Sequence, residues 1–244
     1  MIRDGDRILL GVSGGKDSLS LLLVLRHLQS YAPVRFDLGV ITVDPEVEGF
    51  DPSSLTAYYD ELEVPWHYRS QPIMDEARTR MQGDSFCAYC ARMKRGIMYS
   101  TCREHGYNVL ALAQHLDDLA ESFLMSAFHQ GRLETMKAHY RIDAGDLRVI
   151  RPFVYVREAQ TRDFALAAGL PVVACGSGCA GPSRRVRLAR SWARVSPLAL
   201  SFCTRAMMDC RAMASLLLGS SRRIWSISLV ASSTRPTASS WEAR

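Results

Sequence analysis

The feature that most constrains the fold is the stretch LLGVSGGKDSLSLLL, residues 9–23. An apolar run at 7–12 predicts a buried strand, and the apolar residues from 18 to 28 predict a buried helix. A glycine turn between a strand and a helix N-terminus points several backbone N–H groups at one anion. We therefore predict a phosphate-binding loop at the end of the first strand. Its candidate residues are Ser13, Gly14, Gly15, Lys16, Asp17 and Ser18.

This loop differs from the Walker A motif, which has the form GxxxxGK followed by Ser or Thr. Here Asp17 follows Lys16. The lysine adds a positive charge for a phosphate group, and a carboxylate beside that phosphate suits the orientation of Mg²⁺ or of a ligand hydroxyl. The alternative is a glycine turn in an ordinary βα unit, which the six-residue pattern directly after a strand disfavours.

Apolar runs and helix-like segments alternate along the first 175 residues. We predict further strands at 36–44, 64–70, 107–113, 148–156 and 170–175, and further helices at 52–63, 90–106, 117–128 and 157–168. Such alternation is typical of an α/β fold. We expect an open, mostly parallel sheet with helices on both faces.

The composition indicates a globular protein of a reducing compartment. The 244 residues are 48% hydrophobic and 23% charged. No apolar run approaches the ~18 residues of a membrane span. No apolar signal core follows Met1, so we expect a cytoplasmic location. In that compartment, seven cysteines favour metal binding or chemistry over a disulfide framework.

Net charge divides the chain into two parts. Residues 1–175 hold 19 Lys and Arg against 23 Asp and Glu, a net charge of −4, whereas residues 176–244 hold 11 Arg against 2 acids, a net charge of +9. We predict a globular domain at 1–175 and a Ser/Arg-rich tail at 176–244 that is disordered or non-native coding, such as a reading-frame slip. A basic RNA-binding extension and a divergent segment are the alternatives. The simultaneous loss of lysine and acids favours non-native coding.

The stretch FCAYCARMKRG, residues 86–96, places two cysteines near the start of the helix expected at 90–106. Thiols at a helix N-terminus have lowered pKa values, which suits metal binding or redox chemistry. A structural zinc site needs four ligands, which Cys87, Cys90, Cys175 and Cys179 supply. An iron–sulfur cluster with one open iron needs three, which Cys87, Cys90 and Cys175 supply. A redox pair is disfavoured because the motif lies far from the first strand, and two incidental cysteines remain an alternative.

A polar cluster, AQHLDD at 113–118, follows the strand expected at 107–113. In an open parallel sheet, ligands bind outside the carboxyl ends of the strands. We predict that His115, Asp117 and Asp118 hold Mg²⁺ or the reacting base of a substrate. The alternative is that the two acids only complement the dipole of the helix that they begin.

The loop SGGKDS resembles the pyrophosphate loop of the PP-loop ATP pyrophosphatases (N-type). The resemblance implies an adenine nucleotide α-hydrolase-like fold. It also implies that ATP is split between its α- and β-phosphates to adenylate a carbonyl oxygen, and that a nucleophile then displaces AMP. The nucleoside is implied to lie against the ends of the first two strands, at Val12 and Val43, with Asp44 close by.

Over residues 2–175 the chain resembles the tRNA 2-thiocytidine synthetases. The segments CAYCARMKRGIMY, ALAQHLDD, IRPFVYVREAQ and GLPVVAC follow one another in that family's order and spacing. The resemblance implies a [4Fe–4S] cluster held by the CxxC pair and one later cysteine, with the fourth iron carrying the sulfur. It assigns Cys87, Cys90 and Cys175 as ligands, and Cys179 is the alternative third ligand.

The resemblance extends to other site residues. Lys94 stands one helical turn after Cys90, where related thiolases have a lysine that is proposed to be catalytic. The 2-thiocytidine enzymes often have arginine there, so phosphate binding alone is the alternative role. Asp117 and Asp118 take catalytic roles and His115 a ligand-binding one, while Gln114 stands where the family usually has a second histidine. Cys102, later on the same helix as Cys90, is expected to pack in the core.

The function implied by the resemblance is ATP-dependent tRNA thiolation. An anticodon-loop cytidine, at tRNA position 32, is adenylated at its C2 carbonyl and converted to 2-thiocytidine. The implied cofactors are ATP, Mg²⁺ and the cluster, and the partners are tRNA, a sulfur donor (a cysteine desulfurase or sulfide) and a second copy of the chain. The family's basic N-terminal segment and C-terminal portion have no counterpart in the sequence. The alternatives are another PP-loop thiolase, an amide-forming ligase with zinc-bound cysteines, and an inactive truncated copy.

Overall fold

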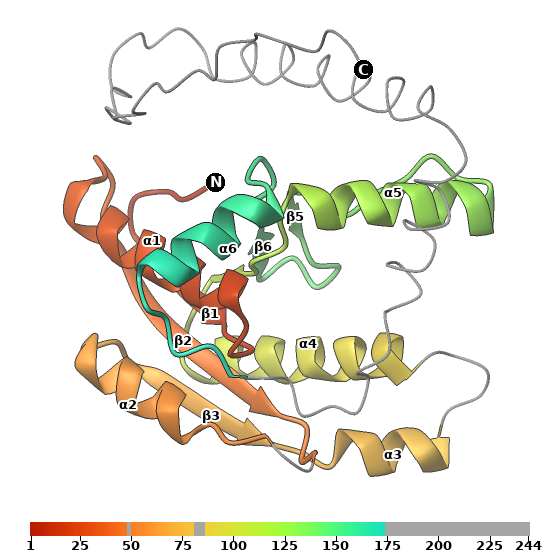
Figure 1. The fold of residues 1–244 in the computed structure, drawn as a ribbon, viewed down its shortest axis with the longest axis horizontal. Coiled ribbons are helices and arrows are strands. Elements are labelled where there is room, and N and C mark those ends of the chain that lie inside the picture. The colour runs from red at the N-terminus through yellow and green to blue at the C-terminus, as the bar shows by residue number, and fades with distance from the viewer. Residues whose placement is uncertain (48–49, 81–85, 174–244) are drawn as a thin grey trace, which may run out of the picture. The chain divides into compact units, whose positions relative to one another are not determined.

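The computed structural model describes residues 1–173 except 48–49 and 81–85. A six-stranded sheet runs through this region in the order β3-β2-β1-β4-β6-β5 (Figure 1). Its strands are β1 (Asp6–Gly11), β2 (Phe36–Asp44), β3 (Trp66–Ser70), β4 (Val109–Ala111), β5 (His139–Arg141) and β6 (Arg148–Ile150). β5 pairs antiparallel with β6, and the strands from β3 to β6 in the sheet order pair parallel. The predicted open, mostly parallel sheet is confirmed.

Helices cover both faces of the sheet, as predicted. They are α1 (Lys16–Tyr31), α2 (Ser53–Glu61), α3 (Ile73–Arg80), α4 (Phe86–Glu104), α5 (Leu116–Gln130) and α6 (Glu158–Ala167). Side chains of β1 alternate between two cores, because successive residues of a strand point to opposite faces. Ile8 and Leu10 pack with residues of α1, α2 and α6, whereas Leu9 packs with residues of α3 and α4. Figure 1 shows α1 and α6 side by side on their face of the sheet.

The strand order reverses beside β1, and this reversal locates the site. β2 and β3 lie on one side of β1, and β4 and β6 lie on the other. The connections that leave β1 and β4 therefore diverge, which opens a crevice at the carboxyl ends of these strands. Ligands of open parallel sheets bind in such crevices.

The strand at 36–44 has its predicted bounds, and those predicted at 64–70 and 107–113 are shorter, at Trp66–Ser70 and Val109–Ala111. Two predicted strands differ more from the structure. The strand predicted at 148–156 ends at Ile150, because Pro152 has no N–H for a ladder and the chain then turns, with Val156 N bonded to Phe153 O at 2.9 Å. The strand predicted at 170–175 is wrong over its described part. The N–H of Val173 donates to the carbonyl of Gly14 at 2.9 Å, outside any strand.

The sequence predicted neither α3 nor β5, which are short and mostly polar. None of the described helices is long and apolar enough to span a membrane. The tail predicted at 176–244 lies outside the described residues.

Gly39 of β2 leaves room for a buried tyrosine. A methyl group on Gly39 overlaps the hydroxyl of Tyr107 and approaches the ring carbon that carries it to 2.8 Å. The Tyr107 side chain is buried, and its hydroxyl lies 3.2 Å from Nε2 of His67, so the ring has little room to move. We expect Gly39→Ala to lower the free energy of unfolding by about 1–3 kcal/mol.

Urea unfolding measures this loss, with Gly96→Ala in α4 as the control. No described atom lies within 4 Å of a methyl group on Gly96. Alanine has the higher helix propensity, so the control is expected to be as stable as the parent or more stable. A Gly39→Ala variant that unfolds at the parent's urea concentration contradicts this account of Tyr107.

Candidate active site

A cavity of about 310 Å³ lies at the carboxyl ends of β1 and β4. It is lined by Gly11, Val12, Ser13, Gly15, Asp17, Ser18, Val43, Lys94, Met98, Leu112, Ala113, Gln114 and Asp118. The phosphate loop, the end of β2, the helix α4 and the start of α5 thus meet in one cleft. Eight of the residues predicted for the site line it, namely Val12, Ser13, Gly15, Asp17, Ser18, Val43, Lys94 and Asp118.

The phosphate loop is held in shape by its glycines and serines. Gly14 has φ +81°, a conformation that favours glycine, and a methyl group there comes within 3.1 Å of Val173 Cβ and 3.2 Å of Leu55 Cδ1. The hydroxyl of Ser18 donates to the carbonyl of Gly15 at 2.9 Å. Gly15 is the N-cap of α1 and makes no side-chain cap. The first amides of α1 therefore suit an anion from outside the chain.

His115 and Asp118 cap the start of α5 reciprocally. Nδ1 of His115 accepts from the N–H of Asp118 at 3.3 Å, and the Asp118 carboxylate accepts from the N–H of His115 at 3.0 Å. An accepting Nδ1 leaves the proton of the neutral ring on Nε2, which faces the Asp17 carboxylate at 4.0 Å. His115 is buried behind the cleft and holds Asp118, one of the carboxylates that line it.

Asp117 turns away from the cleft and toward α6. Its carboxylate accepts from the N–H of Glu158 at 2.7 Å and lies 2.9 Å from a guanidinium nitrogen of Arg157. Burial opposes ionisation of Asp117, but these two partners outweigh burial and lower its pKa. The structure therefore separates two carboxylates that the sequence analysis treated alike: Asp118 lines the cleft, whereas Asp117 joins α5 to α6.

The cysteine pair lies at the start of α4. The helix begins at Phe86, so Cys87 and Cys90 stand in its first two turns, and their i, i+3 spacing puts them on one face of the helix. Lys94, one turn after Cys90, lines the cleft. The side chain of Cys87 and both Cys175 and Cys179 lie outside the described residues.

The described chain ends beside the phosphate loop, two residues before one candidate third ligand. The N–H of Val173 bonds to the carbonyl of Gly14 at 2.9 Å. Cys175 is two residues further, and two residues span at most about 7 Å. Cys179 is six residues further and has a reach of about 20 Å. Cys175 stays the predicted third ligand, with Cys179 as the alternative.

Cys102 packs in the core, as expected. Its side chain is fully buried between α4 and the sheet. Burial raises the pKa of its thiol to about 12, so the group stays protonated at neutral pH. A protonated, buried thiol makes a poor metal ligand.

Comparison with known proteins assigns the family. A model of the PP-loop domain matches residues 2–176. The tRNA-cytidine(32) 2-sulfurtransferase of Geobacter sulfurreducens is 41% identical over 182 residues, which cover 74% of this chain and 71% of that protein. The chain belongs to the tRNA-cytidine(32) 2-sulfurtransferase family. The protein of the same name from Stenotrophomonas maltophilia is 36% identical over 216 residues, covering 86% of this chain and 71% of its own.

Membership in the tRNA-cytidine(32) 2-sulfurtransferase family confirms the resemblance seen in the sequence and makes the chain an ATP-utilising sulfurtransferase. A solved structure shares the fold. The U34-tRNA thiolase NcsA from Methanococcus maripaludis, with its [4Fe–4S] cluster, matches with a TM-score of 0.63 at 19% identity, over 90% of this chain and 74% of that one.

In this member of the 2-sulfurtransferase family, α6 holds the phosphate loop through contacts that the sequence analysis missed. Nζ of Lys16 lies 2.9 Å from the Asp17 carboxylate and 3.0 Å from that of Glu158. The hydroxyl of Thr161 donates to Asp17 at 2.5 Å. Burial lowers the pKa of Lys16, but hydrogen bonds to Asp17 and Glu158 outweigh burial and raise it. The segment VREAQ contains Glu158 and belongs to the family pattern described above, so it was the part of the sequence that could have indicated a role for α6 in the site.

Glu158 competes with a phosphate group for Lys16. We expect Glu158→Gln to tighten ATP binding by a small factor, up to about fivefold, because the pair is half-exposed and worth at most about 1 kcal/mol. Isothermal titration with ATP measures the change. Asp163→Asn, which alters an exposed pair with Arg162 on the same helix, is the control. Weaker ATP binding by Glu158→Gln contradicts a competing role.

Gln114, where the resemblance implies a second histidine, is held by a buried arginine. The amide oxygen of Gln114 accepts from Nε of Arg151 at 2.9 Å. Arg151 is buried and also donates to the carbonyl of Lys137. Gln114 thus presents a fixed amide to the cleft in this sulfurtransferase.

Proposed function

We propose that this chain adenylates the C2 carbonyl oxygen of cytidine 32 in tRNA and replaces that oxygen with sulfur from an iron–sulfur cluster. One observation carries the proposal. In a chain of the tRNA-cytidine(32) 2-sulfurtransferase family, the phosphate loop, Lys94 and Asp118 line one cleft. Cys90 stands one helical turn before Lys94, and Cys87 stands two turns before it.

In the first step the C2 carbonyl oxygen attacks the α-phosphorus of ATP, and the bond to the β-phosphate breaks. Pyrophosphate leaves with the bonding electron pair. Amides of the loop and the ammonium of Lys16 offset the charge on this leaving group. The adenylated cytosine ring carries a positive charge, and the carboxylate of Asp118, which lines the cleft, offsets it.

In the second step hydrosulfide attacks C2. The C2–O bond breaks, AMP leaves with the former carbonyl oxygen, and the S–H proton passes to water, which gives the neutral thiocarbonyl. The sulfur stays at the level of sulfide, so the exchange needs neither oxidant nor reductant. Lys94 is the cation of α4 that lines the cleft, and it stabilises the charge that returns to the AMP phosphate.

The residues around the cleft suit the metal groups that this chemistry requires. Asp17 is a carboxylate beside the loop amides, the kind of ligand that Mg²⁺ takes next to a phosphate. Cys87 and Cys90 share a helix face, and Val173 ties the segment that leads to Cys175 to Gly14. These three cysteines would hold a [4Fe–4S] cluster. Such a cluster, when bound, supplies sulfide from an iron that has no protein ligand.

A reconstituted reaction tests the proposal. The anaerobically purified full chain is given ATP, Mg²⁺, sulfide and a tRNA with cytidine at position 32, and the same tRNA with uridine there is the control. Mass spectrometry of the nucleosides is expected to find 2-thiocytidine only in the first tRNA, with one AMP and one pyrophosphate for each. Thiolation of another base, ammonia-dependent amide formation, or ATP binding without pyrophosphate release would each overturn it in favour of a stated alternative.

A further inference from the structure

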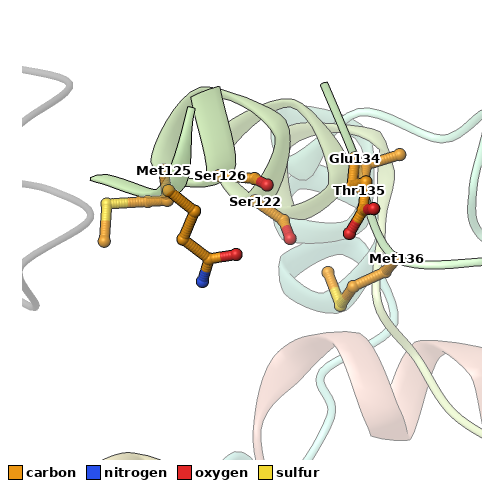
Figure 2. Close-up of a pocket in the computed structure, with 7 residues that line it drawn as sticks. Ser122, Met125, Ser126, Glu134, Thr135 and Met136 are labelled. Carbon is orange, nitrogen blue, oxygen red and sulfur yellow. The ribbon is translucent and has the colours of Figure 1, made fainter. Parts of the chain in front are cut away.

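Two further cavities lie outside the cleft, and their charges differ. The larger, of about 520 Å³, lies between α5 and the segment that follows it. Figure 2 shows Ser122, Ser126, Glu134 and Thr135 around it. Its described lining holds a carboxylate and no cation. The second cavity has two guanidinium groups in its lining, so it suits a polyanion such as RNA better than the first.

This second cavity is a groove of about 320 Å³ along one side of α4. Arg69, from the end of β3, forms one wall. The helix supplies the other residues, Arg92, Met93, Gly96, Ile97, Ser100, Thr101 and Glu104. Lys94 and Met98 of the same helix line the nucleotide cleft, so the groove and the cleft flank one element.

Gly96 has no packing reason to be glycine within the described chain. It lies in the interior of α4, and a methyl group there meets no described atom within 4 Å. Glycine destabilises a helix interior relative to alanine. Gly39 and Gly14, by contrast, face atoms of the protein at close range. Gly96 therefore leaves space in the groove for a group that does not belong to the described chain.

The groove also contains a hydroxyl without a partner. Thr101 is 1% exposed, and its Oγ1 has no hydrogen-bond partner among the described residues. A buried hydroxyl left unsatisfied costs free energy, and such groups in native proteins usually find a ligand or water. Ser100, beside it on the rim, adds a second hydroxyl.

The charge of α4 is opposite to that of the domain around it. Residues 86–104 carry four cations against one acid, Glu104, a net charge of +3, whereas residues 1–175 have a net charge of −4. The four cations are Arg92, Lys94, Arg95 and Arg103, and Arg103 is paired with Asp146. Glu104 is paired with Arg69 at the end of the groove. A cationic helix on an acidic domain marks the face that meets a polyanion.

We propose that this groove binds the sugar–phosphate backbone of the substrate tRNA next to the cytidine that enters the cleft. The inference rests on the proposed function. Arg69 and Arg92 contact phosphate groups, Gly96 lets the strand approach the helix, and the exposed hydroxyl of Ser100 bonds to a ribose or phosphate oxygen. These contacts fix the position of the strand and do not read its bases.

The test measures binding of the tRNA to the full chain by fluorescence anisotropy over a range of salt concentrations. Gly96→Glu places a carboxylate in the groove and is expected to weaken tRNA binding at least about tenfold, with ATP affinity unchanged. Arg92→Gln is expected to weaken binding and to reduce the slope of log K against log salt by about 1. Arg162→Gln, an equal loss of charge on α6, is expected to leave the slope within error of the parent.

Each outcome decides the proposal. If Gly96→Glu fails to fold, Arg92→Gln still tests the groove. Parental affinity and salt slope in both variants, with 2-thiocytidine still formed by the parent, would overturn the groove and leave the proposed function standing. A parent chain that binds no tRNA would overturn both.

Discussion

Replacing Cys90 with serine is expected to abolish 2-thiocytidine formation and to leave ATP binding intact. Removing a residue that hydrogen-bonds to a metal ligand typically lowers activity about 10–100-fold. Removing a proposed cluster ligand is therefore expected to lower the thiolation rate on the order of 100-fold or more. Cys90 does not line the nucleotide cleft, and the phosphate loop lies on another element, so ATP affinity should stay within about twofold of the parent. Nucleoside mass spectrometry and ATP titration measure the two effects.

The matched control is Cys102→Ala in the same helix. Cys102 is fully buried and its pKa is raised to about 12, so it has a packing role. The control is expected to lose some stability and to keep its iron and its thiolation. A Cys90→Ser variant that still forms 2-thiocytidine at the parental rate would remove Cys90 from the site.

Replacing Gly14 with alanine is expected to weaken ATP binding at least about tenfold and to lower the free energy of unfolding by about 1–3 kcal/mol. Two causes act together. The φ of +81° disfavours a side chain, and the added methyl group crowds Val173 and Leu55 at 3.1 and 3.2 Å. Relief of either contact moves the loop amides or the segment that precedes Cys175. ATP titration and urea unfolding measure the two losses.

Gly5→Ala separates these two causes. Gly5 has φ +76° and no described atom within 4 Å of an added methyl group, so it carries the conformational cost without the contacts. The Gly5 variant is expected to lose less stability than the Gly14 variant and to bind ATP like the parent. Equal ATP affinity in the Gly14 variant and the parent would contradict the phosphate-binding role of the loop.

The sequence predicted those elements whose signal is local. β2 has its predicted bounds because nine consecutive residues, FDLGVITVD, form a mostly buried run in a parallel sheet. The phosphate loop was predictable because glycine, serine and lysine stand between a strand and a helix. β5 and α3 carry no such pattern, and β5 is ordered by its pairing with β6.

Contacts over long sequence distances were not predictable. Thr161 donates to Asp17 from 144 residues away, and the sequence around either residue does not indicate that the two are in contact. The adjacent Asp117 and Asp118 looked alike in sequence, yet a helix turns neighbouring side chains about 100° apart, so one faces α6 and the other the cleft. His115 is not among the usual N-cap residues, and its role as a cap became visible only in the structure.

We propose that the sulfur comes from an iron–sulfur cluster, and the metal content of the protein decides whether a cluster is present. The full chain is purified anaerobically, its iron and zinc are measured, and its visible spectrum is recorded with and without Cys90→Ser. We expect about four iron atoms per chain and a broad absorption at ~400 nm that the substitution removes. A colourless chain with one zinc atom that still converts cytidine 32 to 2-thiocytidine with ATP would contradict this proposal.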